Sequence, residues 1–239
     1  MPMRPAGAPA PDWLGTRDLP LRPDEFGEIQ PTPPELVDRR LWTDDMLPPP
    51  PDDRFHITIE HPPPAEVLAR STYRDECPVT ADELAYLTVS FFGFDGLFHT
   101  GELLVHADWA DELAGVFEGL HAQRFPIEEM RVVTQAEQDA HPTGDGNNTS
   151  AFVCRTAVDP TRWSRHASGL AVDINPFHNP YVKDDLVLPE LASAYVDRSD
   201  VRPGMIGPDQ VALFAELGWG WGGNWNTLLD HMHFSDNNR

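Results

Sequence analysis

The chain has 239 residues, 40% of them hydrophobic, which suits one catalytic domain with a tail or two small domains, with a sizeable buried core. Its 39 acidic and 17 basic residues leave a net charge of −22. Affinity for phosphate comes from Lys and Arg, so this charge argues against nucleic acid and anionic lipid surfaces as partners. No stretch approaches the roughly 20 apolar residues of a membrane-spanning helix, and we expect no such segment.

The first ten residues and the cysteines bear on the compartment. Residues 1–10 lack the apolar core of a secretory signal, so the protein stays inside, leaves by another route or has its signal outside this chain. Cys77 and Cys154 are the only cysteines, which excludes a Cys-rich zinc finger and CxxC redox chemistry. They form either one disulfide, which would imply an oxidising compartment, or two buried thiols. The disulfide is our hypothesis, and it would restrain the loop that contains Cys154.

Residues 1–64 contain 16 of the 25 prolines. Proline lacks the amide hydrogen that helices and central strands need, so we predict an extended arm here, with one short helix near residues 34–42. The arm either wraps on the following domain or remains a floppy tail. We expect an ordered domain over residues 65–239, and we expect the arm to be dispensable for its chemistry. Four large side chains are available as anchors: Trp13, Phe26, Leu41 and Trp42.

A β-hairpin is the clearest predicted element in the first half of the domain. Residues 87–94 are rich in β-formers, Asp95-Gly96 is a strong turn signal, and residues 101–106 resume the strand pattern. Ahead of the hairpin, we expect a short helix or strand at residues 66–70 and a helical turn at residues 82–86.

Two helices follow from apolar spacing and end signals. Four apolar residues between 113 and 120 are spaced as on one helix face, which predicts a helix over residues 109–123. Pro208 at a first turn and Gly218 just past an end predict a second helix over residues 208–217. We expect strands at residues 131–133, 169–174 and 228–234, and a loop at residues 144–150.

Two groups of polar residues interrupt the apolar pattern in the second half of the chain. Asp173 lies inside the predicted strand 169–174, and a buried carboxylate is costly unless it is paired or bound to a metal. His166 stands seven residues earlier, and Gly169 lets the chain fold back so that the two side chains can converge. Near the C-terminus, residues 230–234 read Asp-His-Met-His-Phe and add two imidazoles and another acid.

These residue types match a catalytic zinc site. Such a site takes three N or O ligands and keeps one position open for water, and His166, Asp173 and His233 would supply that set. A further group must accept a proton from the water, and Asp230 and His231 are the local candidates. Each element alone has an ordinary explanation, such as a carboxylate held by loop amides. Jointly, H-x-x-G-x-A-x-D followed by D-x-x-H favours the metal site.

The chain resembles the VanY-type zinc D-alanyl-D-alanine carboxypeptidases. The resemblance rests on Ser164-x-His166-x-x-Gly169-x-Ala171-x-Asp173 and on Asp230-x-Met232-His233-Phe234. Phage endolysins that cut L-alanyl-D-glutamate bonds share this pattern, as does the wider group of lysostaphin-type peptidases and the hedgehog signalling domain. Supporting stretches lie at residues 148–155, 173–181 and 218–225. The resemblance covers roughly residues 77–234 and leaves out the Pro-rich arm.

The resemblance implies an α+β fold of the hedgehog and D-Ala-D-Ala-peptidase kind, in which helices pack on one side of a small antiparallel sheet. It also implies Zn2+ on His166, Asp173 and His233. In the carboxypeptidase branch the acid three residues before the last ligand is the general base, which is Asp230 here. Lysostaphin-type members use the first His of a His-x-His, which is His231 here. We favour Asp230 because the remaining motifs follow the carboxypeptidase branch.

Three further residues are candidates for substrate contacts. The family places an arginine near the metal to hold a carbonyl oxygen or a carboxylate, and Arg155 fits that role unless it forms a surface salt bridge. Ser164 either binds substrate or shapes the turn before His166. Trp225, close to Trp219 and Trp221, either lines a substrate cleft or packs in the core.

These residues together predict zinc-dependent hydrolysis of a peptide bond in peptidoglycan stem peptides, with D-Ala-D-Ala as the first choice of bond and L-Ala–D-Glu as the second. The alternative from another class is a zinc-containing binding module without turnover, and the free acid at Asp230 argues against it. We expect a monomer whose partner is the peptidoglycan peptide. The substrate class places it in the cell envelope or outside the cell, while a cytoplasmic location stays open.

Overall fold

The largest sheet is built around the predicted hairpin. The computed structural model describes residues 7–157 and 161–238. Strands β4 (Leu84–Gly93) and β5 (Phe98–His106) pair antiparallel, β3 (Ile57–Glu60) pairs antiparallel with β4, and the short β6 (Pro126–Ile127) adds to β4 in parallel. The hairpin prediction is therefore confirmed, with each strand starting three residues earlier than expected.

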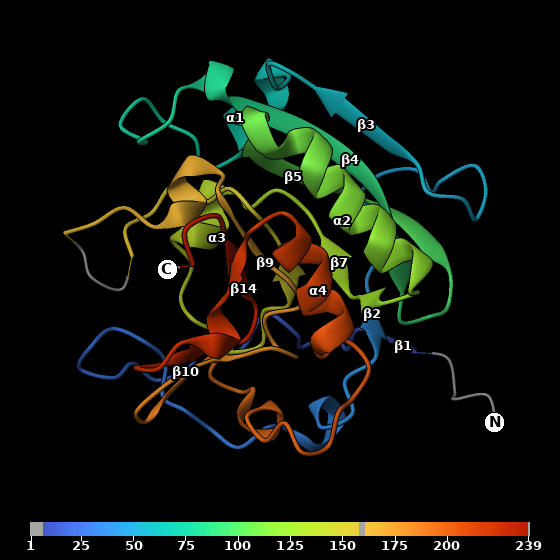
Figure 1. Cartoon of the computed structure of the whole chain (residues 1–239). Helices are drawn as coiled ribbons and strands as arrows, with labels where there is room; N and C mark the ends of the chain where they lie inside the picture. The colour runs from blue at the N-terminus through green and yellow to red at the C-terminus, as the bar shows by residue number, and fades with distance from the viewer. Residues whose placement is uncertain (1–6, 158–160, 239) are drawn as a thin grey trace.

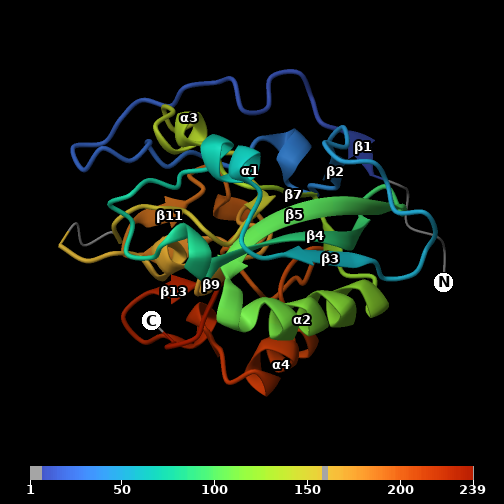
Figure 2. The same ribbon diagram turned by 90° about the horizontal axis from the view of Figure 1, so that it is seen from above.

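Two helices cover one face of this sheet (Figure 1). Helix α2 (Ala110–Ala122) buries its predicted apolar face, and α4 (Pro208–Glu216) packs beside it, where an added Cβ at Gly119 would lie 2.6 Å from Leu213. Both helices match their predictions, and Gly218 ends α4 at a φ of +81°. Figure 2 shows α2 and α4 on one side of the sheet and the N-terminal segment on the other.

The C-terminal part of the chain forms two three-stranded antiparallel sheets. One has the order β12 (Gly220–Trp221), β14 (His233–Ser235), β9 (Ala171–Asp173), and the other β11 (Leu186–Leu188), β10 (Tyr181–Lys183), β13 (Leu229–Asp230). The single strand expected over residues 228–234 is therefore split between them. The chain changes sheet at residues 231 and 232, where the backbone N–H of His231 bonds to Pro180 and the carbonyl of Met232 accepts from Ile174.

The remaining elements are short, and one predicted strand is absent. Residues 131–133 are not a strand because side chains take their amides: the N–H of Arg131 donates to Asn148 and that of Val132 to Glu102. The other elements are β1 (Ala8–Pro9), β2 (Leu41–Trp42), β7 (Glu129–Met130), β8 (Asn148–Thr149), α1 (Ala65–Arg70), α3 (Gln135–Gln138) and the 3-10 helices Pro34–Leu36, Ala81–Glu83, Ala107–Trp109, Arg165–Ser168, Ser193–Tyr195 and Gly222–Asn224.

The architecture is α+β, as predicted. It differs from the expected single small antiparallel sheet, because the described strands divide into five small sheets, two of which are parallel pairs. The main core lies between the large sheet and α2, and it reaches β14 through the stacked rings of Phe214 and Phe234, whose centroids are 3.8 Å apart. No helix in the described ranges combines the length and apolar character needed to cross a membrane.

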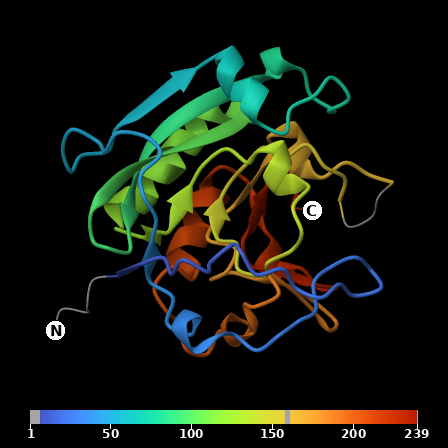
Figure 3. The same cartoon turned by 180° about the vertical axis from the view of Figure 1, so that it is seen from behind.

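The N-terminal segment, residues 7–64, wraps on the rest of the molecule (Figure 3). Leu19, Leu36 and Leu41 belong to a second buried cluster that includes Phe177 and Tyr195. Regular structure begins before Ala65, because β3 is part of the large sheet, and the predicted helix at residues 34–42 shortens to one 3-10 turn. The division into an arm over 1–64 and a domain over 65–239 stays a prediction about independent folding.

The disulfide hypothesis is confirmed. The sulfur atoms of Cys77 and Cys154 are bonded at 2.00 Å. The bridge connects the segment between α1 and β4 with the residue that immediately precedes Arg155. It therefore restrains the loop that carries one of the predicted substrate-binding side chains.

Candidate metal centre

His166 is held by a 3-10 helix, Arg165–Ser168, that is fixed at both ends. At its start, the Ser164 hydroxyl accepts the N–H of His166 at 3.3 Å. At its end, Gly169 adopts a φ of +66°, and an added Cβ there would lie 2.6 Å from the backbone nitrogen of His106. Only glycine fits both the left-handed conformation and this close approach. The turn therefore packs against the end of β5 through Gly169 and carries the buried imidazole of His166.

A hydrogen bond at Nδ1 orients the His166 ring so that its Nε2 faces the other two candidate ligands. Its Nδ1 lies 2.6 Å from the carbonyl oxygen of Ala151, so Nδ1 carries the proton and donates it. In the neutral ring the other nitrogen, Nε2, then carries the free lone pair, and it points at Asp173 and His233. A backbone carbonyl that fixes the tautomer in this way is the usual support for a metal-binding histidine.

Asp173 and His233 meet because they are directly opposite each other in the antiparallel pair β9–β14. Side chains at opposite positions project from the same face of the sheet. His233 Nδ1 lies 3.1 Å from Asp173 Oδ1, and Asp173 in turn exchanges two backbone hydrogen bonds with Ser150. Burial opposes ionisation of Asp173, but the charges and hydrogen bonds of His166 and His233 hold its pKa well below its usual range.

The three side chains fit a tetrahedral metal. His166 Nε2 lies 3.1 Å from Asp173 Oδ2 and 3.2 Å from His233 Nδ1. Tetrahedral zinc with ligands at about 2.0–2.1 Å separates neighbouring ligand atoms by roughly 3.3 Å, close to the three distances observed. The structure thus brings the three predicted ligands into one cluster whose donor types suit Zn2+.

Asp230 is half-buried and lies beside this cluster. It ends β13 opposite Tyr181, and its Oδ1 is buried without a hydrogen-bond partner among the described residues. Burial raises the pKa of Asp230 to about 7, with a further contribution from the charge of Asp173, while His233 and Arg155 act in the opposite direction. An unpaired carboxyl with such a pKa is suited to exchange protons near neutrality.

His231 lies elsewhere. Its ring is buried and packs against Trp221, with the centroids 5.7 Å apart, and it is not among the described residues that line the cavity containing the cluster. Burial and, to a smaller extent, the positive charge of Arg198 together lower the pKa of His231 to about 4. His231 is therefore not exposed to solvent, and its location away from the cavity leaves Asp230 as the better-placed candidate for the general base.

A cavity of about 1380 Å³ joins the predicted residues. Arg155 lies close enough to Asp230 to influence its charge, and its Nη1 donates to the carbonyl of Thr156 at 3.3 Å. The Trp225 ring lies 5.4 Å from that of His233 and is half-buried, whereas Trp219 is in the core. All seven predicted site residues line this cavity: Arg155, Ser164, His166, Asp173, Trp225, Asp230 and His233.

Comparison with known proteins identifies the part of the chain that carries this site. Residues 148–236 match the family model described as D-alanyl-D-alanine carboxypeptidase. The match supports the resemblance to the carboxypeptidase family, and we call residues 148–236 the carboxypeptidase segment. All seven predicted site residues fall within it, whereas residues 1–147 lie outside it. Searches of curated proteins and of solved structures gave no match.

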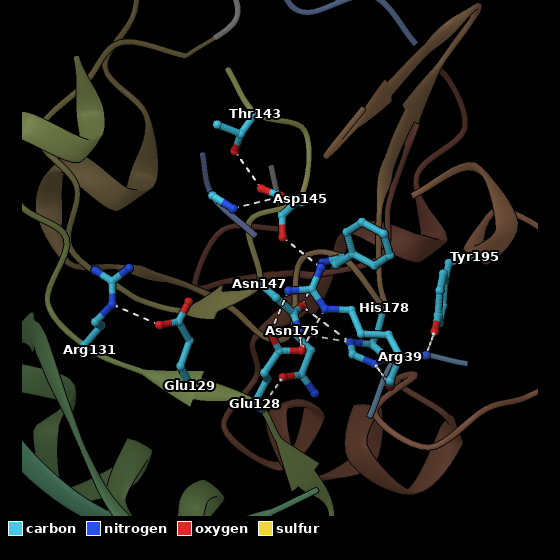
Figure 4. A network of polar contacts seen from close by, with 12 residues as sticks. Arg39, Glu128, Glu129, Arg131, Thr143, Asp145, Asn147, Asn175, His178 and Tyr195 are labelled. Carbon is cyan, nitrogen blue, oxygen red and sulfur yellow. Dashed lines mark hydrogen bonds and ion pairs between the residues drawn. The ribbon is translucent and has the colours of Figure 1, made fainter. Parts of the chain in front are cut away.

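Outside the carboxypeptidase segment, the cavity has walls that sequence reasoning missed. They come from the N-terminal segment and from residues 128–147. The buried guanidinium of Arg39 binds both carboxylate oxygens of Glu128 and the carbonyl of Asp145 (Figure 4). No spacing or motif marks these residues, because their partners are distant in sequence.

Proposed function

We propose that this protein is a zinc-dependent D-alanyl-D-alanine carboxypeptidase that acts on peptidoglycan stem peptides. One observation carries the proposal. In the segment that matches the carboxypeptidase family, three ligand atoms about 3 Å apart converge beside a buried, unpartnered carboxyl group on the wall of one large cavity. The α+β fold and the motifs at residues 164–173 and 230–234 are consistent with the hedgehog and D-Ala-D-Ala-peptidase arrangement.

His166, Asp173 and His233 are the residues that would hold the zinc ion. Bound zinc polarises a carbonyl group and lowers the pKa of water to about neutrality. The Ala151 carbonyl keeps the His166 Nε2 lone pair available, and the β9–β14 register keeps the other two side chains together. The backbone thus fixes the relative positions of the three side chains.

The residues around the three ligands have separate roles in the proposed reaction. Asp230 accepts a proton from the attacking water and passes it to the amine of the departing D-alanine. The Arg155 guanidinium stabilises negative charge on the scissile carbonyl oxygen or on the substrate carboxylate. Ser164 supports the site through the turn that holds His166, since its hydroxyl already accepts a hydrogen bond there. Trp225 covers the His233 side of the cavity.

The disulfide supports a location in the cell envelope or outside the cell. Disulfides persist in oxidising compartments, and peptidoglycan lies in such a compartment. We propose this location on these two grounds.

Mass analysis of purified muropeptides tests the function directly. The zinc-loaded protein is expected to convert pentapeptide stems to tetrapeptide stems and to release free D-alanine. Release of the stem at the L-Ala–D-Glu bond would instead identify an endopeptidase. Zinc binding without any cleavage of wall peptides would identify a binding module. Chelator-treated protein reconstituted with zinc provides the matched control.

A further inference from the structure

The cavity extends well beyond the metal cluster. Its volume of about 1380 Å³ exceeds the roughly 300–1,000 Å³ usual for small-molecule sites. A single departing D-alanine would fill only a small part of this space. Part of the cavity lining lies outside the carboxypeptidase segment, in residues 128–147 and in the N-terminal segment, which contributes Ala10, Pro11, Leu14, Gly15, Phe26, Arg39 and Thr43.

Near the metal cluster, the N-terminal segment contributes an apolar wall. Phe26 packs against a cluster formed by Tyr181, Leu186 and Met232. Met232 immediately precedes the ligand candidate His233, and Tyr181 pairs with Asp230 across β10–β13. Phe26, Tyr181 and Met232 all line the cavity. The N-terminal segment therefore reaches the immediate surroundings of the proposed catalytic residues.

Direct bonds fix the N-terminal segment to residues 128–147, and Figure 4 shows the contacts of Arg39 and Asp145 among them. The N–H of Gly15 donates to Asp145 Oδ2 at 2.9 Å, and that of Leu19 donates to the carbonyl of Pro142 at 2.9 Å. Arg39, with only 2% of its surface exposed, forms its buried ion pair with Glu128 at 2.6 Å. These contacts hold the segment as a fixed wall.

We infer that the N-terminal segment and residues 128–147 form an extended subsite for the part of the stem peptide on the N-terminal side of the scissile bond. The inference rests on the proposed function. It makes a stem peptide, rather than a free D-Ala-D-Ala dipeptide, the preferred ligand. It also reverses our expectation that the arm is dispensable for chemistry.

A bulky substitution at Gly146 would block this subsite without disturbing the surrounding packing. Gly146 is exposed, lines the cavity and lies between Asp145 and Asn147, and an added Cβ would meet no atom within 4 Å. Gly146→Trp should therefore fold normally and occupy the space that the substrate needs. Gly115→Trp is the matched control, because Gly115 is exposed on α2, has equally open space and does not line the cavity. Phe26→Ala tests the apolar wall independently.

The experiment measures binding in full-length, zinc-loaded Asp230→Asn protein, so that turnover does not interfere. Calorimetry compares the pentapeptide L-Ala-D-Glu-L-Lys-D-Ala-D-Ala with acetyl-D-Ala-D-Ala. We expect at least tenfold tighter binding of the pentapeptide. Gly146→Trp should remove that preference, Phe26→Ala should reduce it and Gly115→Trp should preserve it, while the Kd of the short peptide stays unchanged in the two glycine variants.

Equal affinity for the two peptides would overturn the inference, as would an undiminished preference in a folded Gly146→Trp protein. The proposed function fails separately. If the pentapeptide binds as expected but the wild-type protein cleaves no wall peptide, the subsite stands and the carboxypeptidase assignment falls.

Discussion

The metal cluster and the N-terminal segment are assembled in different ways. The cluster uses local geometry: His166 and Asp173 are seven residues apart, and strand register places His233 opposite Asp173. The N-terminal segment is held by isolated contacts across long stretches of chain, such as Arg39 to Glu128, 89 residues apart, and Gly15 to Asp145, 130 residues apart. The candidate catalytic residues therefore lie in two short motifs, at residues 166–173 and 230–233, whereas the shape of the cavity depends on pairs of distant residues that leave no local pattern.

The largest expected effect tests the cluster. His233→Ala removes one of three metal ligands, so the variant should lose zinc, and peptidase activity should fall to background. Metal content per chain and D-alanine release are measured together. His231→Ala is the control from two positions away, and it should keep its zinc and most of its activity, because that ring lies outside the cavity. Zinc retained by His233→Ala would contradict the assignment of the ligands.

The next effect separates metal binding from proton transfer. Asp230→Asn keeps the size of the side chain and removes its basicity, so zinc should stay bound while kcat falls by roughly 10²–10⁴-fold. Kinetics and metal analysis on the same preparation measure both quantities. If Asp230→Asn remained active while His231→Ala abolished turnover, the base would be His231 and the site would follow the lysostaphin-type arrangement.

Arg39→Met tests the anchoring of the N-terminal segment. The side chains of Arg39 and Glu128 are each 1% exposed, so the substitution leaves a buried carboxylate without its cation. We expect the free energy of unfolding to fall by about 3–5 kcal/mol, measured by urea denaturation. Arg40→Met is the control: its ion pair with Asp38 is at the surface and is worth about 0–1 kcal/mol. Equal losses in the two variants would contradict the view that Arg39 is the main anchor.

The same contrast explains what could be predicted from the sequence. The hairpin, α2, α4 and the cluster of His166, Asp173 and His233 were accessible from the sequence because periodicity, turn signals and motif spacing are local properties. The strand expected at residues 131–133 failed because the side chains of Asn148 and Glu102 take its amides. No sequence pattern marks Arg39 as buried, because an arginine in a Pro-rich stretch is expected to be exposed to solvent. Its burial is favourable only because its partners, Glu128 and Asp145, approach it from distant parts of the chain.

The disulfide connects the carboxypeptidase segment with the rest of the chain, because Cys154 lies inside that segment and Cys77 lies outside it. The bridge closes a loop between residues 77 positions apart, so its loss should lower the free energy of unfolding by roughly 2–4 kcal/mol. Urea denaturation with and without a reducing agent measures this effect. A Cys77→Ser, Cys154→Ser double variant should show the same loss and no response to the reducing agent. Wild-type stability that is indifferent to reduction would refute the expectation.

The smallest effect concerns a second attachment of the N-terminal segment, at His99. Its Nδ1 lies 2.7 Å from Asp45 Oδ1, and its Nε2 lies 3.1 Å from Asp95 Oδ1. Both partners are carboxylates, so the ring uses both nitrogens as donors only when it is protonated. Burial disfavours the charged ring, but the bonds to Asp95 and Asp45 outweigh it and raise the pKa of His99 above its usual value.

The sign of the pH dependence follows from this raised pKa. Stabilisation by His99 is fully present below the unfolded pKa of about 6.5, and it is lost as pH rises through the higher folded value. Protease cleavage in the loop around Asp45 should therefore increase as pH rises through that range, and His99→Gln should remove the increase. A cleavage rate that rises equally in wild type and His99→Gln would show that this attachment is independent of the imidazole charge, leaving Arg39 as the principal anchor of the segment.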